Sequence, residues 1–532
     1  MGTYLNIGNA GFESMTRGIY VDKTGMIAWI NHTLGTSDKL TCVSRPRRFG
    51  KSFAAQMLCA YYDKSCDSEA LFAGYKIAAD PSFKKYLNRF DVIYLDITWF
   101  IAIVASVNDI VREIQRKVAE ELAATYPYVE KAATLPEMLV NVNERTGNKF
   151  IFIIDEWDAL FREAKENHGI QEEYIQLLRG LFKSSGVTDK IIEGAYMTGI
   201  LPIKKYGTQS AMTNFREYTM IAPKRLAEYV GFTETEVKEL CQRYGMDFGE
   251  MKRWYDGYFF SRVQSVYNPN SVMEAIKNED LGNYWTQTET YISLQIYIDL
   301  NLDGLKESIV QMLGGACIPI DVGTFQNDMV SIRKRDDVLT LLVHLGYLAY
   351  NSLDKSVFIP NEEIRQEFVR AMAAGSHREI AKLIQNSDTL LERTLDMDEE
   401  GVALALEEAH RVGVAPLYYN NEQDLRSVIR FAYISCIDEF LRIEELPSGT
   451  GYADVVYLPK RGSSMPVLLI ELKWNKTEDG AISQIKRNHY PEVLEDYGGE
   501  ILLVGISYNV KTQQHTCRIE RYQRGAISNK GL

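Results

Sequence analysis

The chain has 532 residues, of which 46% are hydrophobic and 25% are charged, and its net charge is −13. This composition is typical of a soluble globular protein with two to four compact units, and it argues against a disordered chain. The acidic balance disfavours a surface that coats nucleic acid generally. Residues 451–532 are less acidic, with 11 Lys and Arg against 9 Asp and Glu, so a local basic groove remains compatible with the composition.

Targeting and metal-binding signals are weak. The sequence has no run of 18 or more apolar residues and no basic N-terminus followed by an apolar stretch, which predicts a cytoplasmic protein without a membrane partner. Its seven cysteines are scattered without C-x-x-C spacing, which argues against a disulfide framework. His515 and Cys517 lie close together, but no second ligand pair accompanies them, so zinc catalysis has no support.

The first third of the chain alternates short apolar runs with amphipathic helical stretches, a pattern typical of a parallel sheet covered by helices. The predicted strands are residues 40–44, 90–97, 149–154 and 191–199, and the clearest predicted helices are residues 51–63 and 106–126. Residues 1–222 are therefore predicted to form an α/β domain.

The middle of the chain, residues 223–405, has a mostly helical period and is predicted to be a helical lid and connector. A predicted helix at 339–345 is followed by β-like runs at 347–350 and 356–359, which suggests a small unit like a winged helix. The last part, residues 406–532, is predicted to be a second α/β unit. It has a helix at 422–442 and strands at 453–458, 467–473 and 500–506.

A phosphate-binding loop is predicted at residues 45–52, which read RPRRFGKS. Gly50, Lys51 and Ser52 fit the last three positions of a P-loop, after an apolar strand and before a helix. In such a loop the backbone N–H groups surround phosphates, the lysine neutralises them and the hydroxyl holds magnesium. Arg45 stands where the motif usually has its first glycine, and the alternative interpretation is a helix start with an exposed lysine.

An apolar strand that ends in Asp155 and Glu156 supplies the second half of a nucleotide site. Asp155 is predicted to hold magnesium with Ser52, and Glu156 to polarise an attacking water. Thr198, at the end of the next strand, is a candidate sensor of the γ-phosphate. A buried threonine satisfied by the backbone is the equally good alternative.

These residues resemble the AAA-ATPase-like proteins of bacteria and archaea that carry a nuclease-like domain of the PD-(D/E)XK superfamily at the C-terminus. The resemblance is carried by residues 20–24 (YVDKT), 45–52, 154–156 (IDE), 254–258 (WYDGY) and 267–269 (YNP). It implies that arginine at the first glycine position is a family trait and that Asp22, Lys23 and Thr24 lie near the nucleotide. The residues predicted to contact ATP or ADP are Arg45, Arg48, Phe49, Gly50, Lys51, Ser52, Phe53, Asp155 and Thr198, and Arg47 is a further phosphate candidate.

The C-terminal unit carries a constellation that resembles the PD-(D/E)XK, or restriction-endonuclease-like, active site. In that family two carboxylates hold magnesium and a lysine positions the water that attacks a phosphodiester. The matching residues are Asp454, Glu471 and Lys473, with Glu471 and Lys473 on one face of a strand. Glu422 is a candidate third metal ligand beside Asp454 and Glu471. Gln484 is expected to begin a helix near the site, and Tyr452 replaces the arginine that the family usually places before Ala-Asp.

The preferred hypothesis is an ATP-regulated, magnesium-dependent protein that processes DNA or RNA, with Glu156, Asp454, Glu471 and Lys473 as catalytic residues. One alternative is a nucleotide-switch signalling or defence protein whose C-terminal unit only binds a partner. Another is a degenerate ATPase retained as a scaffold. P-loop ATPases often assemble, so a homo-oligomer is also a candidate, with Arg216 only a guess for an arginine finger.

Overall fold

The computed structural model describes residues 2–522 apart from 261–262, 286–290, 327–331, 375–377, 413–424, 449–450, 460–464, most of 427–439 and 489–498, and some positions within 204–213 and elsewhere. The chain divides into two compact units, Met1–Gln287 with Ile318–Ile364, and Thr288–Cys317 with Arg365–Leu532. This partition differs from the three consecutive segments predicted from the sequence. Residues 318–364 return to the first unit, where the Tyr258 hydroxyl donates to the Gly346 carbonyl at 2.6 Å.

A five-stranded sheet forms the centre of the first unit. Its order is β2 (Asp91–Asp96), β3 (Phe150–Asp155), β4 (Ile192–Gly199), β1 (Leu40–Ser44) and β7 (Arg216–Tyr218), and every neighbouring pair is parallel. The four strands predicted from apolar runs are confirmed to within one residue at each end. β7 was not predicted, because a run of only three residues, one of them exposed, carries no period of its own.

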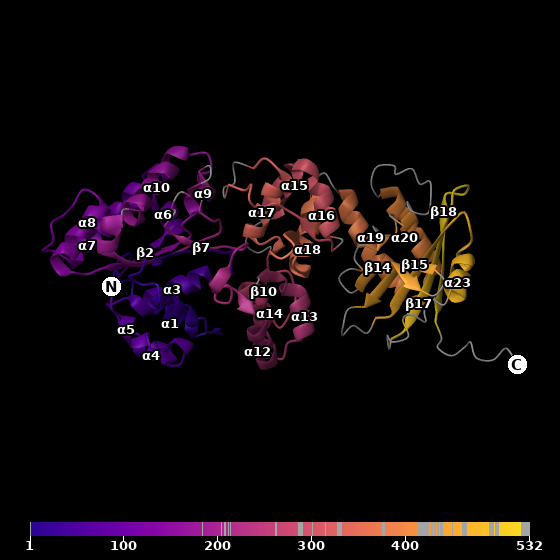
Figure 1. Ribbon diagram of the computed structural model, residues 1–532, viewed down its shortest axis with the longest axis horizontal. Helices are drawn as coiled ribbons and strands as arrows, with labels where there is room; N and C mark the ends of the chain where they lie inside the picture. The colour runs from indigo at the N-terminus through magenta and orange to yellow at the C-terminus, as the bar shows by residue number, and fades with distance from the viewer. Residues whose placement is uncertain are drawn as a thin grey trace. The chain divides into compact units, whose positions relative to one another are not determined.

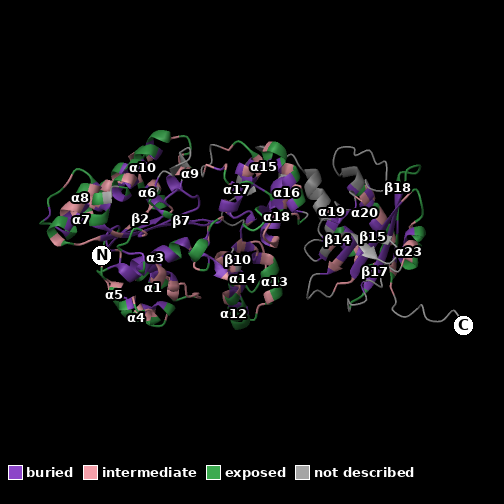
Figure 2. Cartoon of the chain, in the orientation of Figure 1, coloured by how far each residue is buried: buried purple, intermediate pink, exposed green. Residues whose placement is uncertain are grey.

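Helices cover both faces of this sheet (Figure 1). On one face, alternate residues of β3, Phe150, Phe152 and Ile154, share a core with α7 (Ile110–Thr125), α8 (Leu135–Thr146) and α10 (His168–Phe182). On the other, α3 (Lys51–Tyr62) follows the predicted P-loop and packs on β3 and β4, with most of its residues buried (Figure 2). The predicted parallel α/β domain is thus confirmed in its sheet and its helices.

The remaining helices and strands of this N-terminal region are short. They are α1 (Ala10–Thr16), α2 (Gly25–Asn31), α4 (Glu69–Phe72), α5 (Phe83–Tyr86), α6 (Ile97–Ile103), α9 (Ala159–Glu163), α11 (Ser185–Ile191), β5 (Lys205–Tyr206) and β6 (Gln209–Ser210).

The lid region, residues 223–287, contains a small antiparallel sheet as well as the predicted helices. β8 (Phe232–Thr233), β10 (Val263–Tyr267) and β9 (Tyr258–Phe260) form the sheet, and α12 (Glu234–Tyr244), α13 (Phe248–Tyr255) and α14 (Pro269–Asn278) pack around it. Thr233 and Glu236 form a capping box at the start of α12, and proline begins α14 at the position that helices tolerate best.

Residues 318–364 add the predicted helix and hairpin. α17 (Arg335–Leu345) is followed by β12 (Ala349–Asn351) and β13 (Ser356–Phe358), and β11 (Ile318–Pro319) pairs with β13.

The second unit is built on a mixed sheet ordered β14 (Phe440–Ser448), β15 (Gly451–Pro459), β16 (Val467–Trp474), β17 (Ile501–Asn509) and β18 (Gln514–Arg521). Only β16 and β17 are parallel, and α23 (Glu478–Arg487) connects them. The other helices of this unit are α15 (Tyr291–Leu300), α16 (Leu305–Leu313), α19 (Arg378–Leu395) and α20 (Glu399–Val412), while α18 (Glu362–Ala374) begins in the first unit.

Two predicted boundaries in the second unit are wrong. The helix expected at 422–442 cannot reach its predicted end, because β14 begins at Phe440 and pairs with Pro459 of β15. Gln484 does not begin a helix, because Thr477 caps α23 two turns earlier and Gln484 lies within it. Within the part of the chain that the structure describes, no helix is long and apolar enough to cross a membrane.

Candidate functional site

The predicted P-loop connects β1 to α3. Gly50 stands directly before α3 with φ of +89°, a backbone conformation that glycine adopts without strain. Arg48 also has a positive φ, +65°. Lys51 is 4% exposed, and its Nζ donates to the Pro46 carbonyl at 3.0 Å. The loop therefore curls around its own lysine at the start of a helix, as phosphate-binding loops do.

Asp155 lies at the end of β3, with β4 between it and the P-loop strand β1. It is 3% exposed, and the Thr198 hydroxyl of β4 donates to its Oδ1. Burial raises the pKa of the Asp155 carboxyl above its ordinary value, and hydrogen bonds from Ser52 and Thr198 oppose that rise. Ser52 and Asp155, both predicted magnesium ligands, are thus brought together, while Thr198 is bound to the acid.

Glu156 is held between two cations. Its Oε1 lies 3.2 Å from Lys51 Nζ and its Oε2 lies 2.5 Å from an Nη of Arg162. Burial disfavours the charged form, but Lys51 and Arg162 outweigh it and lower the pKa of Glu156 below its ordinary value. Glu156 is ionised in this arrangement, which a residue that polarises water requires.

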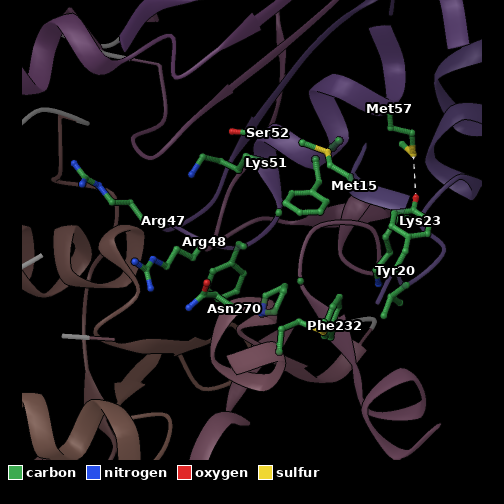
Figure 3. A pocket seen from close by; sticks show the side chains of 18 of the residues that line it. Met15, Tyr20, Lys23, Arg47, Arg48, Lys51, Ser52, Met57, Phe232 and Asn270 are labelled. Atoms are coloured by element: carbon green, nitrogen blue, oxygen red, sulfur yellow. Dashed lines mark hydrogen bonds between the residues drawn. The ribbon is translucent and has the colours of Figure 1, made fainter. Parts of the chain in front are cut away.

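A cavity of about 680 Å³ opens beside these residues (Figure 3). Lys51, Ser52, Arg47 and Arg48 lie toward one side of the view, and Tyr20, Lys23, Met57 and Phe232 toward the other. Of the predicted contacts, Arg48, Phe49, Gly50, Lys51, Ser52, Phe53 and Glu156 line the cavity.

Arg45 is placed away from this cavity. Its side chain is fully buried, donates to the carbonyls of Ser44 and Tyr218 at 2.9 and 3.1 Å, and lies 5.1 Å from the centre of the Phe260 ring. Burial lowers the pKa of the Arg45 guanidinium to about 10. The structure therefore gives Arg45 contacts to the backbone and an aromatic ring, in place of the phosphate contact expected from the sequence.

Of residues 22–24, which are predicted to lie near the nucleotide, only Lys23 lines the cavity. Its Nζ is paired with Glu236 of α12 at 2.6 Å. The Thr24 hydroxyl donates to Asp22 Oδ1 at 2.6 Å, and neither residue is in the cavity lining.

Sequence reasoning missed much of the far wall of the cavity. This wall includes Met15, Ile19, Tyr20, Val21, Met57, Tyr229, Phe232, Asn270, Met273, Glu274 and Lys277. The family resemblance points only to residues 20–24 and 267–269 in this part of the molecule. The rest comes from α1, the residues just after it, α3 and the lid, and nothing in the local pattern of these segments says which cavity they face.

The C-terminal constellation is brought together on two neighbouring strands. The register that pairs Val455 with Ile470 places Asp454 opposite Glu471 when it is continued by one residue. Lys473 Nζ contacts Glu471 Oε1 at 2.9 Å, and the Gln484 amide donates to the same oxygen. Asp454, Glu471 and Lys473 are 7%, 1% and 6% exposed.

Two further contacts involve Asp454. Its Oδ2 accepts the Leu472 backbone N–H at 2.9 Å, and its Oδ1 accepts an Arg426 Nη at 2.6 Å. Arg426 was not predicted. Among the described residues, no group of three or more His, Cys, Asp or Glu side chains is arranged to hold a metal ion. Glu422, the candidate third ligand, lies outside the described residues.

Arg216, the guess for an arginine finger, lies on β7 and forms an ion pair with Asp38, at a site where both side chains are partly exposed.

The sheet, the loop before α3 and the acidic end of β3 together define a nucleotide-binding P-loop fold in the first unit. Comparison with known proteins agrees: residues 6–208 match the model of the family described as "Predicted AAA-ATPase". The match ends at residue 208 and does not include any residue of the second unit. No curated protein matches the chain.

Among solved structures, similarity is found to the Aeropyrum pernix ORC2 protein, solved in ADPNP–ADP complexes. The identity is 10% and the TM-score 0.23, over 66% of this chain and 94% of that one.

Proposed function

We propose that the first unit binds ATP with magnesium and hydrolyses it. The observation that carries the proposal is the opening of Gly50, Lys51 and Ser52, at the start of α3, into a cavity of about 680 Å³ that Glu156 also lines. A helix N-terminus and a lysine suit the phosphates, and the apolar side chains of the far wall suit the rest of a nucleotide. The match of residues 6–208 to an ATPase family supports the same assignment.

The residues that would hold magnesium are Ser52 and Asp155. A hydroxyl and a carboxylate are hard oxygen ligands of the kind that magnesium prefers, and it commonly takes few protein ligands together with phosphate oxygens and water. The buried Asp155 carboxyl, with Ser52 and Thr198 hydrogen-bonded to it, fits this role. When bound, magnesium neutralises charge on the phosphates.

The other side chains divide by position. Arg47 and Arg48 line the cavity and supply positive charge for phosphate, with Phe49 and Phe53 beside them. Glu156 lies within reach of Lys51, so phosphates that attract Lys51 release one oxygen of Glu156 for a water. Thr198 acts through Asp155.

Calorimetric titration with ATP and ADP, with and without magnesium, tests this proposal. We expect Lys51→Ala to weaken ATP binding about 100-fold, because a charge-assisted contact to phosphate is lost. Glu156→Gln should bind ATP but not hydrolyse it. The matched control is Lys190→Ala, which removes an exposed lysine paired with Glu144 on the surface. Equal affinities of Lys51→Ala and Lys190→Ala would remove the basis of the proposal.

For the second unit, the proposal is a magnesium-dependent phosphodiester-cleaving site that acts on DNA or RNA under the control of the nucleotide. The supporting observation is that Lys473 and Gln484 both donate to Glu471 Oε1, while Asp454 lies opposite Glu471 on the neighbouring strand. Asp454 and Glu471 would hold the metal and Lys473 would position water. Before Asp454 Oδ1 can bind a metal, its ion pair with Arg426 has to break.

Incubation of the full chain with ATP, magnesium or manganese, and labelled single- and double-stranded DNA and RNA tests this second proposal. Cleavage should occur with the wild type and be lost in Glu471→Ala and Lys473→Ala. Glu500→Ala, which removes an exposed acid paired with Arg521, is the control. Cleavage that is the same in all four proteins would come from a contaminant and count against the site.

The Arg426–Asp454 contact at 2.6 Å favours the alternative, a C-terminal module that binds a partner without cleaving it. In that case manganese titration, followed by paramagnetic broadening of signals near Asp454, gives no response, while ATP still binds at Lys51. Assembly into a homo-oligomer, expected for P-loop ATPases, is tested by light scattering with and without ATP.

A further inference from the structure

Arg162 connects two acids at the end of β3. It lies on α9, lines the cavity and has a side chain only 10% exposed. One Nη lies 2.5 Å from Glu156 Oε2, and Nε lies 3.2 Å from Asp158 Oδ2. The planar guanidinium spans two separate carboxylates, which an ammonium group, a point charge, reaches less well.

The Asp158 end of this connection is fixed. Asp158 is 1% exposed, and its carboxylate accepts the backbone N–H groups of Ile200 at 3.2 Å and Leu201 at 2.8 Å, directly after β4. A buried carboxylate with two backbone donors has little freedom to move. Asp158 therefore fixes Arg162 near the carboxyl end of β4, the strand that carries Thr198.

The Glu156 end is held in an unusual conformation. Its backbone φ is +52°, in the left-handed region that residues other than glycine rarely adopt. Its two carboxylate oxygens have different partners, Lys51 on Oε1 and Arg162 on Oε2. Lys51 is the cation that phosphates would attract, while Arg162 is tied to Asp158.

We infer that Arg162 is a positioning residue for ATP hydrolysis: it holds Glu156 by Oε2, so that departure of Lys51 toward phosphate exposes Oε1 to water without releasing the carboxylate. The inference rests on the proposed ATPase function. It gives Arg162 no contact with the nucleotide, so its removal alters turnover and leaves affinity in place. Positioning of this kind matters because a displacement of about 1 Å at a reacting group costs about 100-fold in rate.

Steady-state hydrolysis and calorimetric ATP binding, measured on the full chain, test the inference with Arg162→Met and Arg162→Lys. We expect Arg162→Met to lower kcat by about 100-fold with the Kd for ATP within about twofold of wild type. Arg162→Lys keeps the charge but not the fork, and we expect it to recover part of the loss, about tenfold below wild type. The control is Arg116→Met, which removes an arginine that also bridges two acids, Glu113 and Glu120, on the exposed face of α7.

The outcomes separate the inference from the function on which it rests. An unchanged kcat in Arg162→Met, with a wild type that hydrolyses ATP, overturns the inference alone. So does a large loss of ATP affinity in a folded Arg162→Lys, because Arg162 then contacts the nucleotide. A wild type that binds ATP without hydrolysing it overturns both. If Arg162→Met does not fold, Arg162→Lys decides, and wild-type kcat in that variant overturns the inference.

Discussion

The two units each contain a lysine paired with a glutamate, and the pairs differ in what surrounds them. In the first unit, Lys51 lies 3.2 Å from Glu156. The lysine side chain is 3% exposed, and the glutamate side chain is 20% exposed and faces a cavity. In the second, Lys473 lies 2.9 Å from Glu471, and their side chains are 7% and 2% exposed. Glu156 has a second cation, Arg162, whereas Glu471 shares its oxygen between Lys473 and the neutral Gln484. Both lysines are enclosed, but the glutamate faces a cavity in the first unit and is enclosed in the second.

The largest expected effect is on the enclosed pair. Lys473→Met should destabilise the second unit by about 3–5 kcal/mol, because Glu471 stays buried after losing its cation. Urea unfolding of the full chain measures the change in the transition of that unit. Lys486→Met, which breaks an exposed pair with Glu520, should change it by less than about 1 kcal/mol. If the two variants are equally stable, the enclosure of Lys473 and Glu471 does not govern their energetics.

At Asp256 the effect of burial outweighs that of pairing, although Lys252 Nζ lies 3.8 Å from its carboxylate. Burial raises the pKa of its carboxyl, with the Ser265 hydroxyl as the main opposing contact. A carboxyl whose pKa is higher in the folded than in the unfolded protein lowers stability as pH rises from the unfolded pKa to the folded pKa. The stability lost over this interval is not regained at neutral pH. Asp256→Asn should therefore raise stability at pH 7 by about 1 kcal/mol.

The pH profile of thermal unfolding, followed in the transition that ATP shifts, tests this expectation. The gain of Asp256→Asn over wild type should vanish at pH values below the ordinary range of an aspartate and grow as pH rises. A gain that does not change with pH would assign it to packing.

The smallest expected effect on stability is at Lys51, the partner of Glu156. Lys51→Ala should cost the ligand-free first unit about 1 kcal/mol or less, because Glu156 keeps Arg162 and access to water. We expect the same variant to weaken ATP binding about 100-fold, so the effects of Lys51 on affinity and on stability can be measured separately. Thermal unfolding without nucleotide gives the measurement. A loss of 3 kcal/mol or more would place Lys51 in the same class as Lys473.

Much of the sheet and of the phosphate end of the site could be predicted from the sequence. β1, β3 and β4 are short, almost fully buried runs rich in apolar residues. Because the strands are parallel, the residues at their carboxyl ends lie at the same side of the sheet. The contacts of Arg162 were not predictable, because an arginine four residues after an acid reads as an ordinary helical ion pair. The far wall of the cavity combines residues 15–21 and Met57 with residues 229–277, and contacts so distant in sequence leave no local pattern.

Failures in the second unit have a similar cause. Residues 440–443 (FLRI) fit a helical face as well as an alternating strand, and only pairing with β15 decides between them. The strand positions of Glu471 and Lys473 were predicted because the run before them is apolar. The partner of Asp454, Arg426, follows from tertiary packing alone.

The burial of Arg45 has a consequence for the order in which this protein matures on the ribosome. The first residue of the P-loop is anchored by the carbonyl of Tyr218 and the ring of Phe260, and the cavity wall continues to Lys277. A nascent chain that has emerged only as far as residue 208, where the family match ends, carries the whole P-loop sequence but none of these partners. We therefore expect the cavity to be completed only after about half of the chain has been synthesised.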